Sequence, residues 1–284
     1  MLLKDKIAIV TGGGRGIGRA IALDFAKNGA DVVVAARTIS EIESVAEEIR
    51  SIGCQSLAIQ TDMTKEDDIK ALVKKTIEKF GRIDILVNNA GVLIEAPIID
   101  MKTEDWDRVI NVNLRGVFII TREILKIMAQ QKSGCIISIA SGFGIEGQPY
   151  YSAYGASKAG VLLFNDVLAK EARFIKAYVI NPGLIETKMT EKAPGTKDPP
   201  EIVAPIATYL ASDENKLPSG TAVKRLQLDN LKAAILPLIQ GRTYPTWNAL
   251  FQEIKPHLNE KILRNIKKYR KMLPYLFKDY LTQE

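Results

Sequence analysis

The stretch Ile7-Ala8-Ile9-Val10-Thr11-Gly12-Gly13-Gly14-Arg15-Gly16-Ile17-Gly18-Arg19 decides the fold of this 284-residue chain. Its β-branched beginning predicts a buried strand over Ile7 to Thr11, and the residues from Arg19 onward predict a helix. Glycines between a strand and a helix permit a tight turn, and the free N–H groups of the helix end bind phosphate oxygens. This order predicts a site for the pyrophosphate of a dinucleotide, bound by Gly12, Gly14, Arg15, Gly16, Ile17 and Gly18. The alternative is a loop whose glycines serve only turning and packing.

Five further short apolar runs predict strands at Asp31 to Ala36, Ser56 to Gln60, Ile83 to Asn88, Cys135 to Ala140 and Ala177 to Asn181. Their nearly continuous apolar character is typical of strands that are buried on both faces. Amphipathic stretches separate them, such as Ile39 to Arg50, which we expect to be a helix with Ser40 as its N-cap. This alternation predicts an α/β fold, a doubly wound Rossmann-type parallel sheet with helices on both faces.

The chain changes character after Asn181. Prolines and glycines are frequent in residues 182–200, where we expect a mobile loop, followed by a helix near Glu201 to Ser212. Loops of this kind often cover a site. Beyond residue 228 we expect helices separated at Pro237, Gly241, Pro245, Pro256 and Pro274. We therefore predict a catalytic and cofactor-binding domain at residues 1–228 and a helical, basic C-terminal extension at residues 229–284.

Composition excludes several classes of protein. The hydrophobic share of 46% and the charged share of 25% are typical of a globular protein, and no long uncharged apolar run predicts a transmembrane segment. The N-terminus leaves no room for the core of a signal peptide, so we expect a cytoplasmic protein. A single histidine, His257, and two distant cysteines, Cys54 and Cys135, provide no ligand set, so no metal site is expected.

The net charge of +6 belongs to the end of the chain. Residues 1–220 carry 27 basic against 28 acidic side chains, whereas residues 221–284 carry 12 against 5. We expect no nucleic acid partner for the chain as a whole. For the basic, amphipathic segment between Lys261 and Lys271 we favour a helix that packs by its apolar stripe onto its own chain or a partner subunit. An acidic carrier protein is a second candidate partner, and a membrane surface or nucleic acid is a third.

The end of the second predicted strand indicates which dinucleotide binds. An NAD site usually has an acidic residue there that accepts the ribose 2′-OH, but this chain has Ala35-Ala36-Arg37-Thr38. Arg37 and Arg15 could instead hold the 2′-phosphate of NADP(H) through charge-assisted hydrogen bonds. The sequence therefore predicts that NADP(H) is preferred, with NAD(H) as a second option and two solvated arginines as the structural alternative.

Residues suited to proton transfer occur at Ser141 and in the segment Tyr154-Gly155-Ala156-Ser157-Lys158. Tyr154 and Lys158 are four residues apart, so on a helix they share one face. A nearby ammonium favours the phenolate, and we expect it to lower the pKa of Tyr154 from its ordinary value of about 10. Ser141 could hydrogen-bond a substrate oxygen. By itself, a tyrosine and a lysine at this spacing are more often a surface pair.

Taken together, these motifs resemble the short-chain dehydrogenase/reductase family over about residues 5–220. The chain is similar in particular to its 3-oxoacyl-[acyl-carrier-protein] reductase-like members. The resemblance rests on the Thr11 to Gly18 loop, Asn88-Asn89-Ala90-Gly91, Asn113, Ser141, the Tyr154 and Lys158 pair and Asn181-Pro182-Gly183. Ser141 also precedes Tyr154 by thirteen residues, as in the family.

The resemblance implies a role for each matched residue. Tyr154 would be the general acid/base, Lys158 would tune it and bind the nicotinamide ribose, Ser141 would hold the carbonyl, and Asn113 would anchor a water of the proton relay. For Asn113 and Asn88 the alternative is a buried amide that ties a helix to a strand, which we favour for Asn88. The other implied cofactor-binding residues are Asp62 at the adenine, Met63, Asn89, Ala90, Gly91, Pro182, Gly183, Ile185 and Thr187 at the nicotinamide.

The function that this resemblance implies is NADP(H)-dependent reduction of a carbonyl or oxidation of the matching alcohol, in a homodimer or homotetramer. Family members commonly end in an Asp-Gly-Gly segment near the dimer interface, which this chain lacks after Gly220. A mostly apolar set of candidate pocket residues favours a hydrophobic carbonyl such as a 3-oxoacyl thioester over a free sugar. A sugar or polyol dehydrogenase is the second interpretation, and a non-catalytic dinucleotide-binding sensor or scaffold is the third. The candidate pocket residues are Val92, Leu93, Ile94, Phe143, Ile145, Tyr151, Leu184 and Met189.

Overall fold

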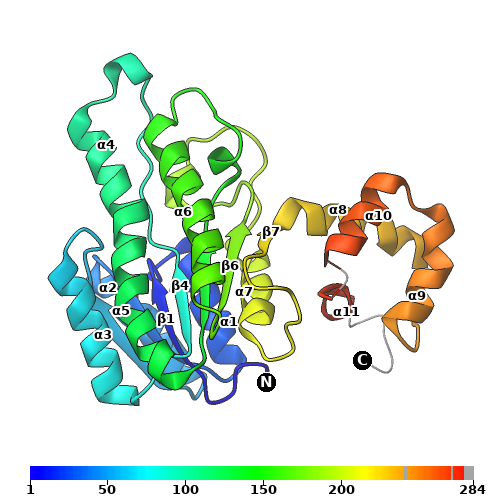
Figure 1. The fold of residues 1–284 in the computed structure, drawn as a ribbon, viewed down its shortest axis with the longest axis horizontal. Coiled ribbons are helices and arrows are strands. Elements are labelled where there is room, and N and C mark those ends of the chain that lie inside the picture. Colours follow the sequence, from blue (N-terminus) through cyan, green and yellow to red (C-terminus); the bar gives the residue numbers. More distant parts are fainter. Residues whose placement is uncertain (240–241, 270, 278–284) are drawn as a thin grey trace. The chain divides into compact units, whose positions relative to one another are not determined.

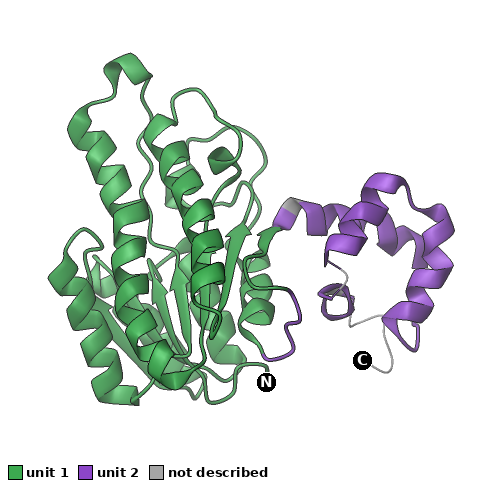
Figure 2. Cartoon of the chain, viewed as in Figure 1, with its two compact units in different colours: residues 1–212, 218–223 green, residues 213–217, 224–284 purple. Residues whose placement is uncertain are grey.

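The computed structural model describes residues 1–239, 242–269 and 271–277. The chain divides into two compact units, which Figure 2 colours separately. Unit 1 comprises Met1–Ser212 and Pro218–Val223, and unit 2 comprises Asp213–Leu217 and Lys224–Glu284. Among the described residues, no helix combines the length and the apolar composition that crossing a membrane requires.

A seven-stranded sheet with the order β3-β2-β1-β4-β5-β6-β7 forms the centre of unit 1. The pairs from β3 through to β6 are parallel, as the doubly wound prediction requires. Two residues predicted in the fourth strand precede it, because Ile83 N–H bonds to the side chain of Gln131 rather than to the ladder. A seventh strand joins the six that the sequence predicted. The strands are β1 (Ile7–Thr11), β2 (Asp31–Ala36), β3 (Ser56–Gln60), β4 (Ile85–Asn88), β5 (Cys135–Ile139), β6 (Lys176–Asn181) and β7 (Ala222–Lys224).

Helices cover both faces of the sheet (Figure 1). One group is α1 (Gly16–Lys27), α2 (Ile39–Ser51) and α7 (Ala204–Ala211). The other is α3 (Glu66–Phe80), α4 (Thr103–Ile110), α5 (Gly116–Gln131) and α6 (Ser152–Glu171), with a π-helical turn, Asn111–Arg115, joining α4 to α5. Two expectations were wrong: α1 begins at Gly16, before Arg19, and the N-cap of α2 is Thr38. Because α2 already starts at Ile39, Ser40 lies inside its first turn.

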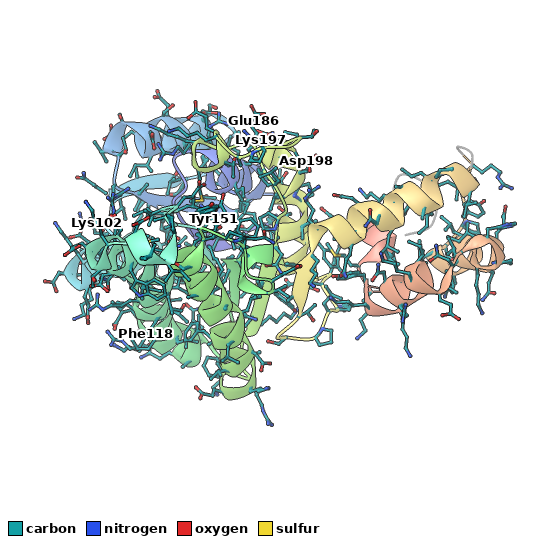
Figure 3. The ribbon with its side chains drawn as sticks, turned by 90° about the horizontal axis from the view of Figure 1, so that it is seen from above. Lys102, Phe118, Tyr151, Glu186, Lys197 and Asp198 are labelled. Carbon is teal, nitrogen blue, oxygen red and sulfur yellow. The ribbon has the colours of Figure 1, made fainter. Side chains whose placement is uncertain are left out.

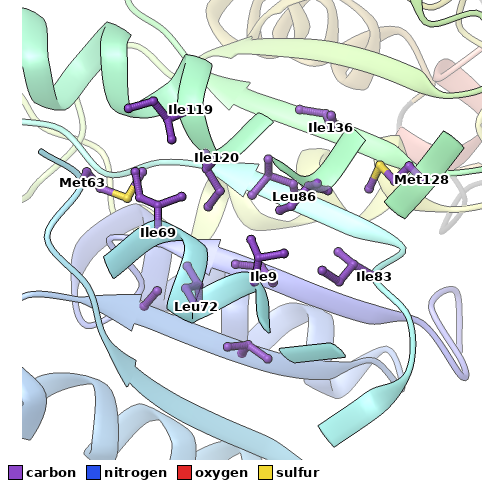
Figure 4. Close-up of a cluster of buried hydrophobic side chains, with 14 of the residues drawn as sticks. Ile9, Met63, Ile69, Leu72, Ile83, Leu86, Ile119, Ile120, Met128 and Ile136 are labelled. Carbon is purple, nitrogen blue, oxygen red and sulfur yellow. The ribbon is translucent and has the colours of Figure 1, made fainter. Parts of the chain in front are cut away.

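The core of unit 1 fills the space between the sheet and the helices α3 and α5. Ile9 and Leu86 come from neighbouring strands, and Ile69 and Ile120 come from the two helices; all four are fully buried. Figure 4 shows these side chains converging on one layer. This burial of apolar surface fixes the positions of the strands and therefore of the loops at their carboxyl ends.

The strand order reverses at β1, which lies between β2 and β4. In sheets of this kind, ligands bind in the crevice outside the carboxyl ends of the strands at such a reversal. Thr11 ends β1 and Asn88 ends β4 beside it. The glycine-rich loop and the segment that follows Asn88 therefore meet at this point.

The segment 182–200 holds a series of local contacts. Ile185 and Asp198 form a parallel bridge, and Glu186 N–H donates to Asp198 O at 2.8 Å. Figure 3 shows Glu186, Lys197 and Asp198 side by side in this segment. It contains the 3₁₀ turn Lys188–Thr190 and leads into a second, Pro200–Ile202; two more, Ile98–Asp100 and Gly142–Gly144, lie elsewhere in unit 1. The loop is thus built around its own hydrogen bonds.

Unit 2 is helical and has a core of its own. Trp247 is 3% exposed and lies 5.6 Å from Phe277 between ring centroids, and Ile266 and Tyr269 are also buried. Pro237 does not separate two helices: α8 continues through it to Ile239, although the proline has no N–H to donate within the helix. The predicted break at Gly241 lies outside the described residues. The elements are α8 (Arg225–Ile239), α9 (Trp247–Ile254), a 3₁₀ turn (Lys255–His257), α10 (Glu260–Tyr269) and α11 (Leu273–Leu276).

Candidate active site

A cavity of about 480 Å³ opens where the loops after the six strands β1 to β6 come together in unit 1. Every site residue predicted from the sequence lines it except Gly18 and Asn113. The fold thus gathers residues from Gly12 to Thr187 around one space. The lining also includes residues that the sequence did not single out, among them Thr38, Glu41, Arg108, Lys188 and Thr190.

The glycine-rich loop forms one wall of the cavity. Gly12 has a φ of +64°, and a Cβ added there would lie 2.9 Å from Ala90 Cα, so both the turn and the close approach require glycine. The Asn89 side-chain amide donates to Thr11 O at 3.0 Å and to Gly12 O at 3.1 Å. Gly18 does not line the cavity because it packs α1 against the loop, where a Cβ would collide with Gly12 O. These contacts hold the loop in a form that exposes its backbone.

Charged groups gather where β2 and β3 end. Burial alone would raise the pKa of Asp62, but hydrogen bonds from Thr64 and the charges of Arg37 and Lys65 lower it overall. Arg15 Nη1 lies 2.9 Å from Glu41 Oε1 in an ion pair. Both arginines predicted to hold a 2′-phosphate therefore line the cavity, and each has a carboxylate near it. No motif in the sequence indicated Glu41 as a site residue.

The proposed reacting groups lie on the opposite side of the cavity. Tyr154 and Lys158 are in successive turns of α6, and Lys158 Nζ lies 5.6 Å from the centroid of the Tyr154 ring. Lys158 Nζ donates to Ile139 O at 2.8 Å, which fixes it at the end of β5. The Tyr154 hydroxyl hydrogen-bonds Ser141, and Phe143 N–H donates to Ser141 Oγ at 3.2 Å. The serine, the tyrosine and the lysine thus line the same cavity close to one another.

Burial shifts the pKa values of both Tyr154 and Lys158. Tyr154 is 8% exposed and Lys158 is 5% exposed. Burial lowers the pKa of Lys158 to about 8, because an ammonium loses its hydration there. Burial also raises the pKa of Tyr154, although the hydrogen bond with Ser141 lowers it. The expectation of a lowered tyrosine pKa was therefore wrong, since desolvation outweighs the hydrogen bond with Ser141.

Asn113 lies in the π-helical turn between α4 and α5 and is 1% exposed. Its Oδ1 accepts from Val92 N–H at 2.8 Å, and its Nδ2 donates to Val92 O at 2.9 Å and to Ser157 Oγ at 3.1 Å. The side chain therefore ties the loop after β4 to α6. Its predicted role as the anchor of a water stays a prediction. Asn88 makes the structural contacts expected of it, with Thr121 on α5 and Ser138 on β5.

Apolar and aromatic side chains surround Tyr154. Phe143 packs against Tyr154 edge to face at 6.4 Å and against Tyr151 at 4.7 Å between ring centroids. Of the predicted pocket residues, Val92, Leu93, Ile94 and Met189 line the cavity, whereas Phe143, Ile145, Tyr151 and Leu184 are not part of its lining. Arg108 on α4 also lines it and was missed, because it follows no apolar pattern.

The residues present fit a nicotinamide dinucleotide. The cavity combines a backbone-lined glycine loop at a helix N-terminus with buried hydroxyl and ammonium groups at the far end. The loop packs closely against α2 at Gly14, because a Cβ there would lie 2.8 Å from Glu41 Cβ. The fold and this cavity define a dinucleotide-binding α/β protein with a tyrosine and a lysine placed for proton transfer.

The chain belongs to the short-chain dehydrogenase family, whose pattern matches residues 6–198. It is 39% identical over 238 residues to a 3-oxoacyl-[acyl-carrier-protein] reductase of Thermotoga maritima, covering 78% of this chain and 97% of that protein. A protein of the same name from Synechocystis sp. is 41% identical over 215 residues, covering 75% of this chain and 86% of the relative.

Solved structures agree with this assignment. Levodione reductase superposes with a TM-score of 0.74 at 29% identity, covering 78% of this chain and 96% of that structure. A short-chain type dehydrogenase/reductase from Mycobacterium marinum has a TM-score of 0.75 at 31% identity, covering 78% and 94%. The superpositions include nearly all of each solved structure but only 78% of this chain, so a part of this chain extends beyond them.

Proposed function

We propose that this oxidoreductase uses NADP(H) to reduce a 3-oxoacyl thioester, or to oxidise the matching alcohol. The observation that carries the proposal is the convergence of Ser141, Tyr154 and Lys158 at the end of a cavity that begins at the glycine-rich loop. The names of the relatives support the substrate class, since they are reductases of 3-oxoacyl groups on an acyl carrier protein.

A bound nicotinamide dinucleotide would supply or accept the hydride. The cavity-lining residues from Gly12 to Ile17 would hold its pyrophosphate, Asp62 and Met63 would lie at the adenine, and Lys158 would bind the nicotinamide ribose. Arg15 and Arg37 favour NADP(H), because their guanidinium groups match a 2′-phosphate. NAD(H) is the second option.

The chain's own residues would move the proton. In reduction, the Tyr154 hydroxyl donates a proton to the substrate oxygen, and the Ser141 hydroxyl donates a hydrogen bond to the same oxygen. The raised pKa of Tyr154 keeps this proton in place at neutral pH. The Lys158 ammonium then stabilises the phenolate that remains. In oxidation the same groups act in reverse.

The apolar lining supports the thioester over the alternatives. Val92, Leu93, Ile94 and Met189 offer few polar partners to a sugar, which has many hydroxyl groups to satisfy. The second interpretation, a sugar or polyol dehydrogenase, would show turnover with those alcohols instead. A non-catalytic sensor or scaffold would bind the dinucleotide and turn over nothing.

One substrate screen separates these functions. Oxidation of NADPH is followed by absorbance with acetoacetyl thioesters, aldehydes and diketones, and reduction of NADP⁺ is followed with sugars and polyols. We expect the highest kcat/KM with the thioesters. Higher kcat/KM with a sugar or a polyol contradicts the substrate class, and binding without any turnover contradicts the enzyme.

The partners are part of the same proposal. A cytoplasmic homodimer or homotetramer is the expected form, because the family resemblance implies it. An acidic carrier protein that delivers the 3-oxoacyl group would match the basic face of α10, where Lys261, Arg264 and Lys267 are exposed.

A further inference from the structure

Glu41 places a carboxylate among the residues that would receive the 2′-phosphate. It lies in the first turn of α2, and it lines the cavity together with Arg15, Arg37 and Thr38. Its Oε1 is 2.9 Å from Arg15 Nη1. The cation that the sequence assigns to the cofactor is therefore already paired within the protein.

The position of Glu41 is fixed by packing as well as by charge. A Cβ added at Gly14 would lie 2.8 Å from Glu41 Cβ and 3.2 Å from Glu41 Oε2, so Glu41 rests directly on the phosphate loop. Its side chain is 34% exposed, against 54% for Arg15. Glu41 is thus held beside the loop, whereas Arg15 extends further into solvent.

A second carboxylate acts on the other candidate cation. The charge of Arg37 contributes to the lowered pKa of Asp62, which also lines the cavity. This end of the cavity therefore contains two cations and two carboxylates. An NADP(H) site made of arginines alone would present a stronger positive field.

The two forms of the dinucleotide differ at this end only. A phosphate monoester carries nearly two negative charges at neutral pH, and Glu41 repels it. To bind that phosphate, Arg15 must exchange the carboxylate for it. An unmodified 2′-OH is neutral and can donate a hydrogen bond to a carboxylate.

We propose that Glu41 is a specificity-determining residue, which narrows the preference of this chain for NADP(H) over NAD(H) by pairing with Arg15. The inference rests on the proposed dinucleotide-dependent function. It assigns to Glu41 a role opposed to that of Arg15, although both residues line the same end of the cavity.

The test is Glu41→Gln, which keeps the shape of the side chain and removes its charge. The Kd values of NADPH and NADH are measured by fluorescence titration of the full chain. We expect the Kd of NADPH to fall about fivefold to tenfold, because the phosphate gains Arg15 and loses a repelling charge. The Kd of NADH should change by less than about threefold, since it has no charge at this position.

The chain provides a matched control. Arg19 and Glu48 form an ion pair of 2.6 Å between the same two helices, and neither residue lines the cavity. Glu48→Gln removes the same charge from α2 and should leave both Kd values unchanged. Compared with Arg15→Ala alone, the double variant Arg15→Ala, Glu41→Gln should gain less NADPH affinity than Glu41→Gln gains in the parent, because only the repulsion is left to remove. Thermal melting of each variant verifies that it is folded.

Two results would overturn the inference: an NADPH to NADH ratio of Kd values that stays within twofold of the parent, which includes equal tightening of both cofactors, or a gain in NADPH affinity that is as large without Arg15 as with it. In the first case Glu41 and Arg15 are only an exposed pair of the kind that contributes little. These results do not affect the proposed function, which is judged by turnover. If the parent chain turns over no carbonyl, the titrations still decide the role of Glu41.

Discussion

Tyr154 combines a raised pKa with a place among apolar groups at the end of the cavity. Tyr154→Phe removes the hydroxyl that would transfer the proton and leaves the ring packing against Phe143 in place. We expect kcat to fall by at least about 100-fold, the usual scale of a general acid. The Kd of NADPH should stay within about threefold, because the hydroxyl is one of many contacts along the cavity.

Tyr151→Phe is the control for this variant. The Tyr151 hydroxyl donates to Glu95 Oε1 at 2.9 Å, and Tyr151 does not line the cavity. Its loss should change kcat much less than the loss of the Tyr154 hydroxyl. Turnover by Tyr154→Phe close to that of the parent would refute the assignment of the acid.

Lys158 predicts how the reaction depends on pH. Its pKa of about 8 means that the ammonium is present below pH 8 and is lost as the pH rises above it. The charge that stabilises the phenolate of Tyr154 is lost with it, so kcat/KM for carbonyl reduction should fall above about pH 8. The measurement is kcat/KM between pH 6 and about pH 10, at saturating NADPH.

Lys158→Arg tests whether this lysine causes the fall. A guanidinium stays charged over the whole range, so the activity that remains should be independent of pH where that of the parent declines. If the variant keeps the parent's decline, another group titrates. If the parent's rate rises above pH 8, the role of the ammonium is contradicted.

Single residues were predictable where local sequence decides their position. The phosphate loop, Tyr154 and Lys158 follow from short motifs, and Tyr154, Lys158 and all the loop residues predicted to bind the pyrophosphate except Gly18 line the cavity. The Arg15 and Glu41 pair joins residues 26 positions apart. Only the packing of α1 against α2 brings them together, so no local pattern indicates the pair. The direction of the Tyr154 pKa was missed for the same reason, since burial is a property of the folded chain.

Elements were predictable in proportion to their length. The strands with five or six residues were found nearly at their true bounds, whereas β7 has three residues, too few to show a pattern. Its position depends on tertiary hydrogen bonds, such as those from Val179 N–H to Thr221 O at 3.2 Å and from Gly220 N–H to Ala177 O at 2.8 Å. The break predicted at Pro237 was wrong, because α8 runs past it to Ile239 although a proline within a helix removes one backbone hydrogen bond.

The helix α10 separates its apolar and basic residues onto two faces. Ile266 and Tyr269 are buried, and the Tyr269 hydroxyl donates to Gln227 Oε1 at 2.8 Å. Lys261, Arg264 and Lys267 are exposed and form no ion pair with any described residue. The apolar stripe is thus buried within unit 2, and the basic face is exposed to solvent, where an acidic partner could bind it.

Charge reversal on this face tests the proposed carrier protein. With Arg264→Glu, Lys267→Glu we expect the KM of a 3-oxoacyl group on an acidic carrier protein to rise about fivefold or more, because complementary charge is replaced by repulsion. The KM of the same acyl group on coenzyme A should stay within about twofold, since that substrate has no protein surface to bind.

A matched pair on unit 1 controls for net charge. Lys75 and Lys79 are exposed on α3, and Lys75→Glu, Lys79→Glu changes the net charge by the same amount. This variant should leave both KM values unchanged. Equal effects of the two double variants on the carrier substrate would mean that only the overall charge matters, and no effect of either would remove the carrier from the proposal.

At the scale of the whole molecule, the charge distribution divides the chain into a long, nearly neutral part and a basic end. The division at residue 228 that the sequence predicted stays a prediction about folding and function. The chain's two tryptophans allow it to be tested, because Trp106 lies on α4 in unit 1 and Trp247 lies in the core of unit 2. Each unit has its own buried core, so we expect each to unfold in its own transition.

The cofactor should affect only one of these transitions. Under the proposed function NADP⁺ would bind the cavity of unit 1, and at 100 times its Kd it would stabilise that unit by about 2.7 kcal/mol, equivalent to about 5 to 10 °C in Tm. In calorimetry of the full chain we expect two transitions, of which NADP⁺ raises one. In a Trp106→Phe variant the remaining emission comes from Trp247, and its midpoint should not move with NADP⁺. If the Trp247 midpoint instead rises together with the calorimetric transition, the two units unfold as one, and the C-terminal helices are then part of the cofactor-binding domain.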